Sequence, residues 1–257
     1  MAGHSHWAKV RHQKGVTDAR KGKLFSKLVR EIALAAKLGG GDPGFNPRLR
    51  RAVETAKAEG VSSESITRAI QRGTGEVAGE AYEEILYEGY APGGVAVLVE
   101  AATDNRNRTA AEVRSLFTRH GGNLAGAGSV SWLFQRKGII RVDSTKASFD
   151  RVFEVALEAS ADDVQASDGS IEILSPPERF EGIVKSLETA KIPIESATLG
   201  YVPQNLVSIK DEESARALLR LLDSLEEHED VQHVFANFEM SPEILAQVEA
   251  AASVPGR

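Results

Sequence analysis

The sequence predicts an α+β fold, in which a small bundle of three helices is followed by small α+β units. Over the first part of the chain, apolar residues recur every three to four positions, which is the period of an amphipathic helix. From Tyr82 onward, short apolar runs alternate with helical patterns and are separated by turns that contain glycine and proline. This alternation is typical of small α+β units rather than of one long parallel sheet.

The three helices of the bundle are expected before residue 79. The first has its apolar face on residues such as Phe25 and Ile32, and it ends at glycines 39–41. Asn46 gives the second helix an N-cap, and the proline after it suits the first helical turn. The third helix opens at Ser62 or at the serine that follows it, and an Arg-Gly-Thr-Gly-Glu loop closes the bundle.

The rest of the chain is expected to alternate between strands and helices. Strands are expected at residues 82–90, 95–99, 129–134, 138–143, 162–167, 170–174, 194–200, 206–210 and 230–239. Helices are expected at residues 108–120 and 148–159, after the Pro-Pro pair at 176–177, and at 212–227. A short helix and a frayed tail are expected after Met240.

The charge of the chain is divided along its length. The net charge is −6, but residues 1–79 hold 15 Lys/Arg and 7 Asp/Glu, giving +8, whereas residues 80–257 hold 16 and 30, giving −14. Such asymmetry suggests a region that binds a polyanion, carried on a body that repels it. A basic face that is merely solvated fits the composition equally well.

The composition also limits the compartment and the chemistry. The chain has no cysteine, so disulfides and thiolate metal sites are excluded. It has no apolar run of membrane-spanning length and no secretory signal, so we expect a cytoplasmic protein without a membrane partner. We also find no nucleophile elbow, no His-Glu-x-x-His motif and no P-loop, and therefore expect no catalytic residues, no cofactor and no small-molecule substrate.

The polar face of the first predicted helix carries a stripe of cations at helical spacing, opposite its apolar face. Cations so close together repel one another unless an anion lies against them, so we favour phosphate contact over a solvated face. The next helix adds a second cluster of arginines. The candidate contact residues of the bundle are Arg20, Lys21, Lys23, Lys27, Arg30, Lys37, Arg48, Arg50 and Arg51.

Residues 1–16 are expected to form an extended, mobile basic arm. Its candidate contact residues are His4, His6, Trp7, Lys9, Arg11, His12 and Lys14. The histidines lack acidic or cysteine partners nearby and lie among cations, so we expect no metal site there. Trp7 has two interpretations, stacking on a base or a guanidinium and packing on the bundle.

The run Thr103–Thr109 lies between a predicted strand and a predicted helix. Its Asp and Asn residues are ordinary turn and capping residues, whereas Arg106 and Arg108 are candidates for phosphate contact, and both interpretations stay open. The glycine-rich segment at residues 121–128 follows a helix, which favours a connection over a nucleotide site.

Motifs along nearly the whole chain resemble the YebC/PmpR family. They are MAGHS at residues 1–5, Trp-Ala at 7–8, GKLFSKL at 22–28, LGGGDP at 38–43, NPRLR at 46–50, IQRGTG at 70–75, YEGYAPGGVA at 87–96, DNRNRT at 104–109, HGGNL at 120–124 and DVQHV at 230–234. His6 departs from the pattern, because the family usually has lysine there. This removes a fixed charge from the arm and makes its contribution partly dependent on pH.

The resemblance implies an α+β domain inserted into another one. The expected domains are a basic helical bundle with its arm at 1–79, a central domain at 80–130 and 206–240, an inserted domain at 131–205, and a tail at 241–257. Members of the family are generally described as cytosolic DNA-binding transcriptional regulators. Mitochondrial relatives resemble activators of translation, and bacterial relatives are linked to ribosomes slowed on proline-rich sequences.

We therefore expect a non-catalytic nucleic-acid-binding regulator of gene expression, with a DNA-binding transcriptional regulator as the leading interpretation. The alternative is a ribosome-associated translation factor that binds ribosomal RNA, which the lack of an obvious base-reading helix favours. An enzyme acting on nucleic acid is the remaining rival, and it would need a cluster of carboxylate or histidine groups with abnormal titration.

Overall fold

The computed structural model describes residues 18–79, 81–167 and 169–252, and it confirms the predicted α+β class. The expected arm at residues 1–16 and the last residues of the expected tail lie outside this range. The described chain forms two compact units, one made of residues 18–131 and 207–252 and the other of Trp132–Leu206. The boundaries of the expected domains stay a prediction, because a division into compact units does not test which parts fold independently.

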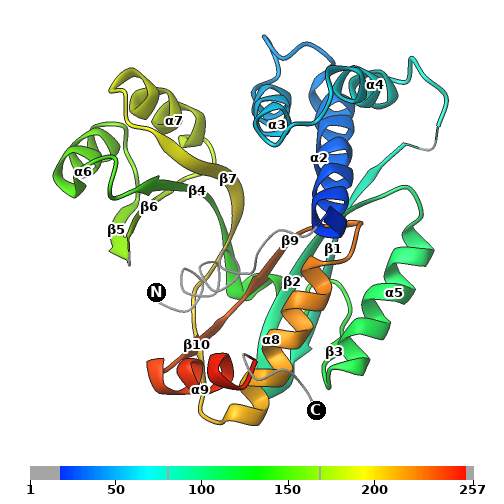
Figure 1. The fold of residues 1–257 in the computed structure, drawn as a ribbon, viewed down its shortest axis with the longest axis vertical. Coiled ribbons are helices and arrows are strands. Elements are labelled where there is room, and N and C mark those ends of the chain that lie inside the picture. The colour runs from blue at the N-terminus through cyan, green and yellow to red at the C-terminus, as the bar shows by residue number, and fades with distance from the viewer. Residues whose placement is uncertain (1–17, 80, 168, 253–257) are drawn as a thin grey trace. The chain divides into compact units, whose positions relative to one another are not determined.

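The predicted bundle is present as α2 (Asp18–Gly39), α3 (Pro47–Ala58) and α4 (Ser63–Thr74), as Figure 1 shows. Asn46 caps α3 as expected, since its Oδ1 accepts the Leu49 N–H at 3.0 Å. Its Nδ2 also donates to the carbonyls of Ala35 and Gly40, both at 2.8 Å, and this fixes the α2–α3 loop. Ser62 caps α4.

The first unit also contains an antiparallel sheet, with the strand order β3-β1-β2-β9. These strands are β1 (Glu83–Ala91), β2 (Val95–Thr103), β3 (Asn123–Leu124) and β9 (Val231–Ala236). The short strand β3 was not predicted, and β2 is longer than the expected run at 95–99. Eight of the nine residues of β2 are buried, which explains its nearly continuous apolar sequence.

Helices α5 (Arg106–Arg119) and α8 (Glu212–Glu226) pack against each other beside this sheet (Figure 1). The Nε2 atom of His120, which caps the end of α5, lies 3.0 Å from the hydroxyl of Ser224 in α8. Burial lowers the pKa of His120, and the charges of Arg119 and Arg220 lower it further. The ring is therefore suited to a neutral hydrogen bond between the two helices.

The prediction of a single strand at residues 230–239 is wrong. The segment divides into β9 and β10 (Phe238–Met240), and β10 pairs in parallel with β8 (Val207–Ile209). Asn237 separates them, because its Oδ1 accepts the Ala96 N–H at 2.7 Å while its own carbonyl accepts the Val207 N–H at 2.8 Å. The predicted helix after Met240 is present as α9 (Pro242–Ala252).

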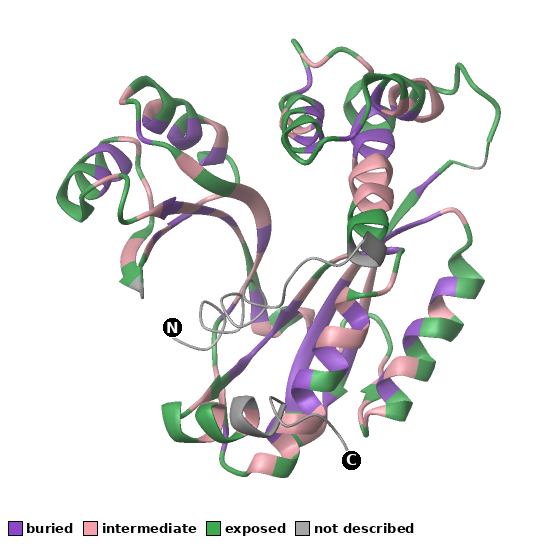
Figure 2. Ribbon diagram, in the orientation of Figure 1, coloured by how far each residue is buried: buried purple, intermediate pink, exposed green. Residues whose placement is uncertain are grey.

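The second unit has the order strand, helix, strand, strand, helix, strand. Its elements are β4 (Phe134–Asp143), α6 (Phe149–Glu158), β5 (Asp163–Ser167), β6 (Ser170–Ser175), α7 (Phe180–Thr189) and β7 (Ile194–Pro203). The sheet is antiparallel in the order β5-β6-β4-β7, which is the ferredoxin-like arrangement. Figure 2 shows that α6 and α7 each have a buried side and an exposed side.

The prediction of a strand at residues 129–134 is also wrong, because a 3₁₀ turn at Ser131–Leu133 precedes β4. The carboxylate of Glu88, which is only 4% exposed, accepts the backbone N–H groups of Gly128, Val130 and Ser131 at 2.7, 2.7 and 2.8 Å. These donors are therefore not available to a β-ladder.

Candidate nucleic-acid interface

The cations predicted on α2 differ in their contacts within the chain. Lys21 and Lys23 are exposed near the start of the helix. Lys27 donates to the carbonyl of Glu226, and Lys37 donates to the carbonyl of Tyr82 at 3.0 Å. The predicted stripe is therefore partly used to attach α2 to the end of α8 and to the segment just before β1. The side chain of Arg20 and all candidate residues of the arm, from His4 to Lys14, lie outside the described residues.

Arg30 is a deeply placed cation of the stripe, with a side chain only 14% exposed. It donates to the carbonyl of Glu229 at 2.6 Å and lies 3.3 Å from the carboxylates of both Glu229 and Asp230. Its guanidinium also lies 5.9 Å from the centre of the Tyr82 ring. These acidic partners are 199 and more residues away in sequence, so helical spacing alone does not reveal them.

The arginines of α3 also differ in their contacts. Arg48 forms ion pairs with Glu31 at 2.7 Å and with Glu84 at 3.2 Å. Burial lowers the pKa of Arg48, but hydrogen bonding and the negative charges of these two partners outweigh it, so its pKa lies above the ordinary value. Arg50 is exposed and Arg51 is half-buried, and Arg50 donates to the Pro43 carbonyl at 3.3 Å.

Asp230 is the buried acid on which several elements converge. Its carboxylate accepts hydrogen bonds from Thr109 at 2.6 Å, Arg108 at 2.8 Å and Thr103 at 3.2 Å, in addition to its ion pair with Arg30. Burial by itself raises the pKa of Asp230. The hydrogen bonds from Thr109 and Arg108 and the charges of Arg30 and Arg108 outweigh that effect, so the pKa lies below its ordinary value.

This geometry accounts for much of the Thr103–Thr109 run. Asn105 caps α5 by accepting the Arg108 N–H at 3.1 Å, and Thr109 is fully buried beside Asp230. Arg108 forms ion pairs with Asp104 and Asp230, whereas Arg106 is exposed. The capping interpretation is confirmed for Asn105, and phosphate contact through Arg106 and Arg108 stays a prediction.

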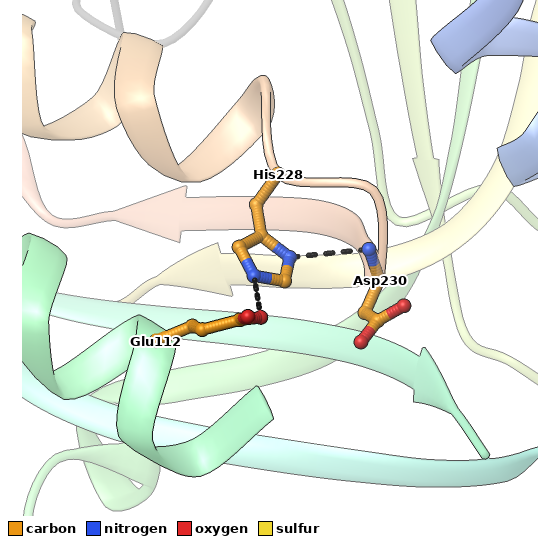
Figure 3. Close-up of side chains that lie close together, drawn as sticks. All are labelled: Glu112, His228 and Asp230. Atoms are coloured by element: carbon orange, nitrogen blue, oxygen red, sulfur yellow. Dashed lines mark hydrogen bonds and ion pairs between the residues drawn. The ribbon is translucent and has the colours of Figure 1, made fainter. Parts of the chain in front are cut away.

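Asp230 also belongs to a cluster with Glu112 and His228 (Figure 3). The Nδ1 atom of His228 accepts the Asp230 backbone N–H at 3.1 Å, which leaves the proton on Nε2 to be donated to Glu112 at 2.9 Å. Spacing along the chain does not reveal this cluster, because its members come from α5 and from the α8–β9 connection. It is the type of grouping that an enzyme or a metal site would need.

The donor set nevertheless fits a structural network better than a metal ion. Both ring nitrogens of His228 are already bonded, and the Asp230 carboxylate already accepts from Arg108 and Thr109. A divalent cation there would lie close to two guanidinium groups, Arg30 and Arg108, which would repel it. The cluster therefore ties the α8–β9 connection to α5.

An open hollow of about 520 Å³ includes this cluster. It is lined by Lys23, Arg30, Asp104, Arg108, Glu112, Glu227, His228, Glu229 and Asp230. Five of these side chains are carboxylates and three are Lys or Arg, so the hollow is unsuited to phosphate. Among the described residues, a polyanion is better served by the exposed cations Lys21 and Arg50, which lie outside the hollow, and by Lys23, which is exposed although it lines the hollow.

The class of protein that emerges is a basic helical bundle fastened by ion pairs to an acidic α+β body. Family models match this chain over nearly its whole length. They are the TACO1/YebC protein N-terminal domain at residues 5–76 and the TACO1/YebC second and third domain at residues 82–238. The chain belongs to the TACO1/YebC family, which confirms the resemblance found in the sequence.

Similar proteins agree with this assignment. A "Probable transcriptional regulatory protein" of Methylacidiphilum infernorum is 62% identical over 249 residues, which cover 97% of this chain and all of that protein. One from Geobacter sulfurreducens is 53% identical over 95% of this chain and 98% of its own length. The crystal structure of a conserved hypothetical protein from Aquifex aeolicus matches with a TM-score of 0.87 and 52% identity, over 93% of this chain and 99% of that one.

The helices of the described residues can be compared with the length and hydropathy that a membrane span requires. None of their helices is both long enough and apolar enough to cross a bilayer.

Proposed function

We propose that this protein is a non-catalytic nucleic-acid-binding regulator of gene expression in the cytoplasm, and specifically a DNA-binding transcriptional regulator. The observation that carries the proposal is the separation of charge, +8 in residues 1–79 against −14 in the remainder. A basic segment of this kind gains affinity by neutralising phosphates, and the acidic remainder limits contact to that segment. The names of the relatives support a regulatory role.

The bonding pattern suggests two roles for the predicted contact residues. Lys21, Lys23 and Arg50 are exposed, so we assign them, together with the cations of the arm, to phosphate contact. The cations whose side chains bond to segments distant in the sequence are assigned to positioning the bundle. They are Lys27, Arg30, Lys37, Arg48 and Arg108.

A ribosome-associated translation factor is the second candidate, and one observation favours it. Sequence-specific DNA readers commonly use Asn or Gln on an exposed helix, in addition to Arg, to recognise base edges. Between residues 18 and 79 the amide side chains are those of Asn46, which is buried as a cap, and Gln71, which is half-buried. Such a surface suits phosphates more than bases, and folded ribosomal RNA offers phosphates on several sides.

The salt dependence of binding tests the part that both candidates share. A protein that neutralises roughly six phosphates should lose affinity for duplex DNA with a log-log slope near −5. We expect this slope to become less steep when Lys21, Lys23 and Arg50 are changed to Glu. A matched control changes three exposed cations of the second unit, Lys146, Arg179 and Lys185, to Glu. This control should leave the slope unchanged. Affinity that ignores salt would refute phosphate binding.

A further inference from the structure

Helix α6 presents a row of large apolar side chains to solvent. Phe149, Phe153 and Leu157 are 38%, 42% and 59% exposed, and their spacing of four aligns them along the helix. The two phenylalanine rings stack, with their centres 5.8 Å apart. The helix meets its own core through other residues, among them Val152 and Ala156. The exposed row is therefore additional to the face that the fold requires.

An acidic row runs beside the apolar row. Asp150, Glu154 and Glu158 are all exposed, and each follows one member of the apolar row by a single position. Arg151, the one cation of α6, pairs with Glu154 at 2.8 Å. The whole segment 132–206 holds eight Lys/Arg and twelve Asp/Glu, for a net charge of −4.

We propose that these two rows form a docking surface for a partner protein, which contributes an amphipathic helix with an apolar row beside a basic row. Exposed contiguous apolar side chains mark interaction sites, and an apolar seam flanked by charges is how helices select partners of opposite charge. A second copy of α6 would bring like charges together. Nucleic acid and anionic lipid would be repelled by the same acidic row. The surface shares no residue with the proposed nucleic-acid contacts.

The probe is a designed helical peptide of about three heptads with a leucine row beside a lysine row. Its comparison peptide has glutamate in place of each lysine. Fluorescence anisotropy with the full chain should show the lysine peptide binding at least tenfold more tightly than the glutamate peptide. Added salt should reduce that difference, because the selectivity is electrostatic.

Three variants separate docking from general attraction. Phe153→Asp with Leu157→Asp removes the apolar row and should weaken the lysine peptide at least tenfold, with circular dichroism confirming that the fold is kept. Glu154→Lys with Glu158→Lys should reverse the preference between the peptides. Glu188→Lys with Glu195→Lys changes the net charge equally at exposed positions outside α6, and should leave the preference unchanged.

Several outcomes would overturn the proposal. One is no binding of the lysine peptide up to millimolar concentration, and another is equal binding to the wild type and to the variant that lacks the apolar row. A third is a dimer in sedimentation equilibrium that disappears in that variant, since the occupant would then be a second copy of the chain.

Discussion

The carboxylate of Asp230 joins three parts of one unit. Its side chain is 3% exposed, yet it stays ionised because Arg30 of α2 and Arg108 of α5 supply positive charge and Thr109 supplies a hydroxyl. The bundle, α5 and the start of β9 therefore meet at a single ionised group. Its loss would leave the largely buried guanidinium of Arg30 with Glu229 as its remaining carboxylate partner among those described above.

We predict that Asp230→Asn lowers the free energy of unfolding of this unit by about 3 kcal/mol at neutral pH, because it removes one partner of a buried ion pair. The pKa of Asp230 in the folded protein lies below its unfolded value of about 3.9. The stabilisation is therefore present above the unfolded pKa and is lost as the pH falls through the folded pKa. Urea unfolding at neutral and acidic pH, followed through the amide NMR signals of β2, measures both effects.

The control for this prediction is Glu54→Gln, which removes an exposed carboxylate from α3 of the same unit. We expect a change within about 0.5 kcal/mol for that variant. If Asp230→Asn destabilised the unit equally at acidic pH, the effect would come from altered packing and not from the charge.

At the scale of elements, the close approach of α2 and α4 depends on glycine. A Cβ atom at Gly73 in α4 would lie 2.2 Å from the Ala33 carbonyl oxygen and 2.8 Å from the Ala36 Cβ of α2. Gly22 in α2 is also helical, but a Cβ atom there meets nothing within 4 Å. The same substitution should therefore have opposite effects at the two positions.

We predict that Gly73→Ala destabilises the bundle by about 1–3 kcal/mol through overpacking. Gly22→Ala should stabilise it by up to about 1 kcal/mol, because alanine has the higher helix propensity. Thermal and urea unfolding followed by helical circular dichroism measures both. A loss of stability at both positions would show that the contact between α2 and α4 is not what requires Gly73.

Elements with strong local signals were predictable from the sequence. The glycines at 39–41, the Asn46 cap before a proline and Ser62 mark the helices of the bundle within one or two residues. The errors arose where a distant partner decides the backbone, as Glu88 does near residue 130 and Ala96 does at Asn237. For the same reason the spacing of cations on α2 could not show that Arg30 faces Glu229 and Asp230.

For the whole molecule, the internal ion pairs make a truncated chain a poor test of nucleic-acid binding. A chain that begins near Tyr82 lacks the basic bundle, but it also leaves Asp230 without Arg30 and Glu84 without Arg48. Loss of binding in such a fragment would therefore mix lost contacts with lost structure. Charge reversal at exposed cations of the intact chain avoids this problem.

The last prediction distinguishes DNA from the ribosome as the target of the intact protein. The described bundle surface is rich in cations and nearly lacks amide side chains, so we expect random duplex DNA to compete almost as well as promoter DNA. Co-sedimentation with ribosomes should survive an excess of competitor DNA, because folded RNA surrounds a bundle and an arm with phosphates on several sides.

The triple variant Lys21→Glu, Lys23→Glu and Arg50→Glu should lose co-sedimentation, whereas the control with Lys146, Arg179 and Lys185 changed to Glu should retain it. The opposite result is equally definite. It would be a defined promoter footprint, with random duplex DNA bound at least about a thousandfold more weakly at equal salt. That affinity ratio lies within the range of specific DNA binders. Because phosphate contacts alone discriminate weakly, that ratio would require base contacts or DNA deformation, and it would establish transcriptional regulation over ribosome binding.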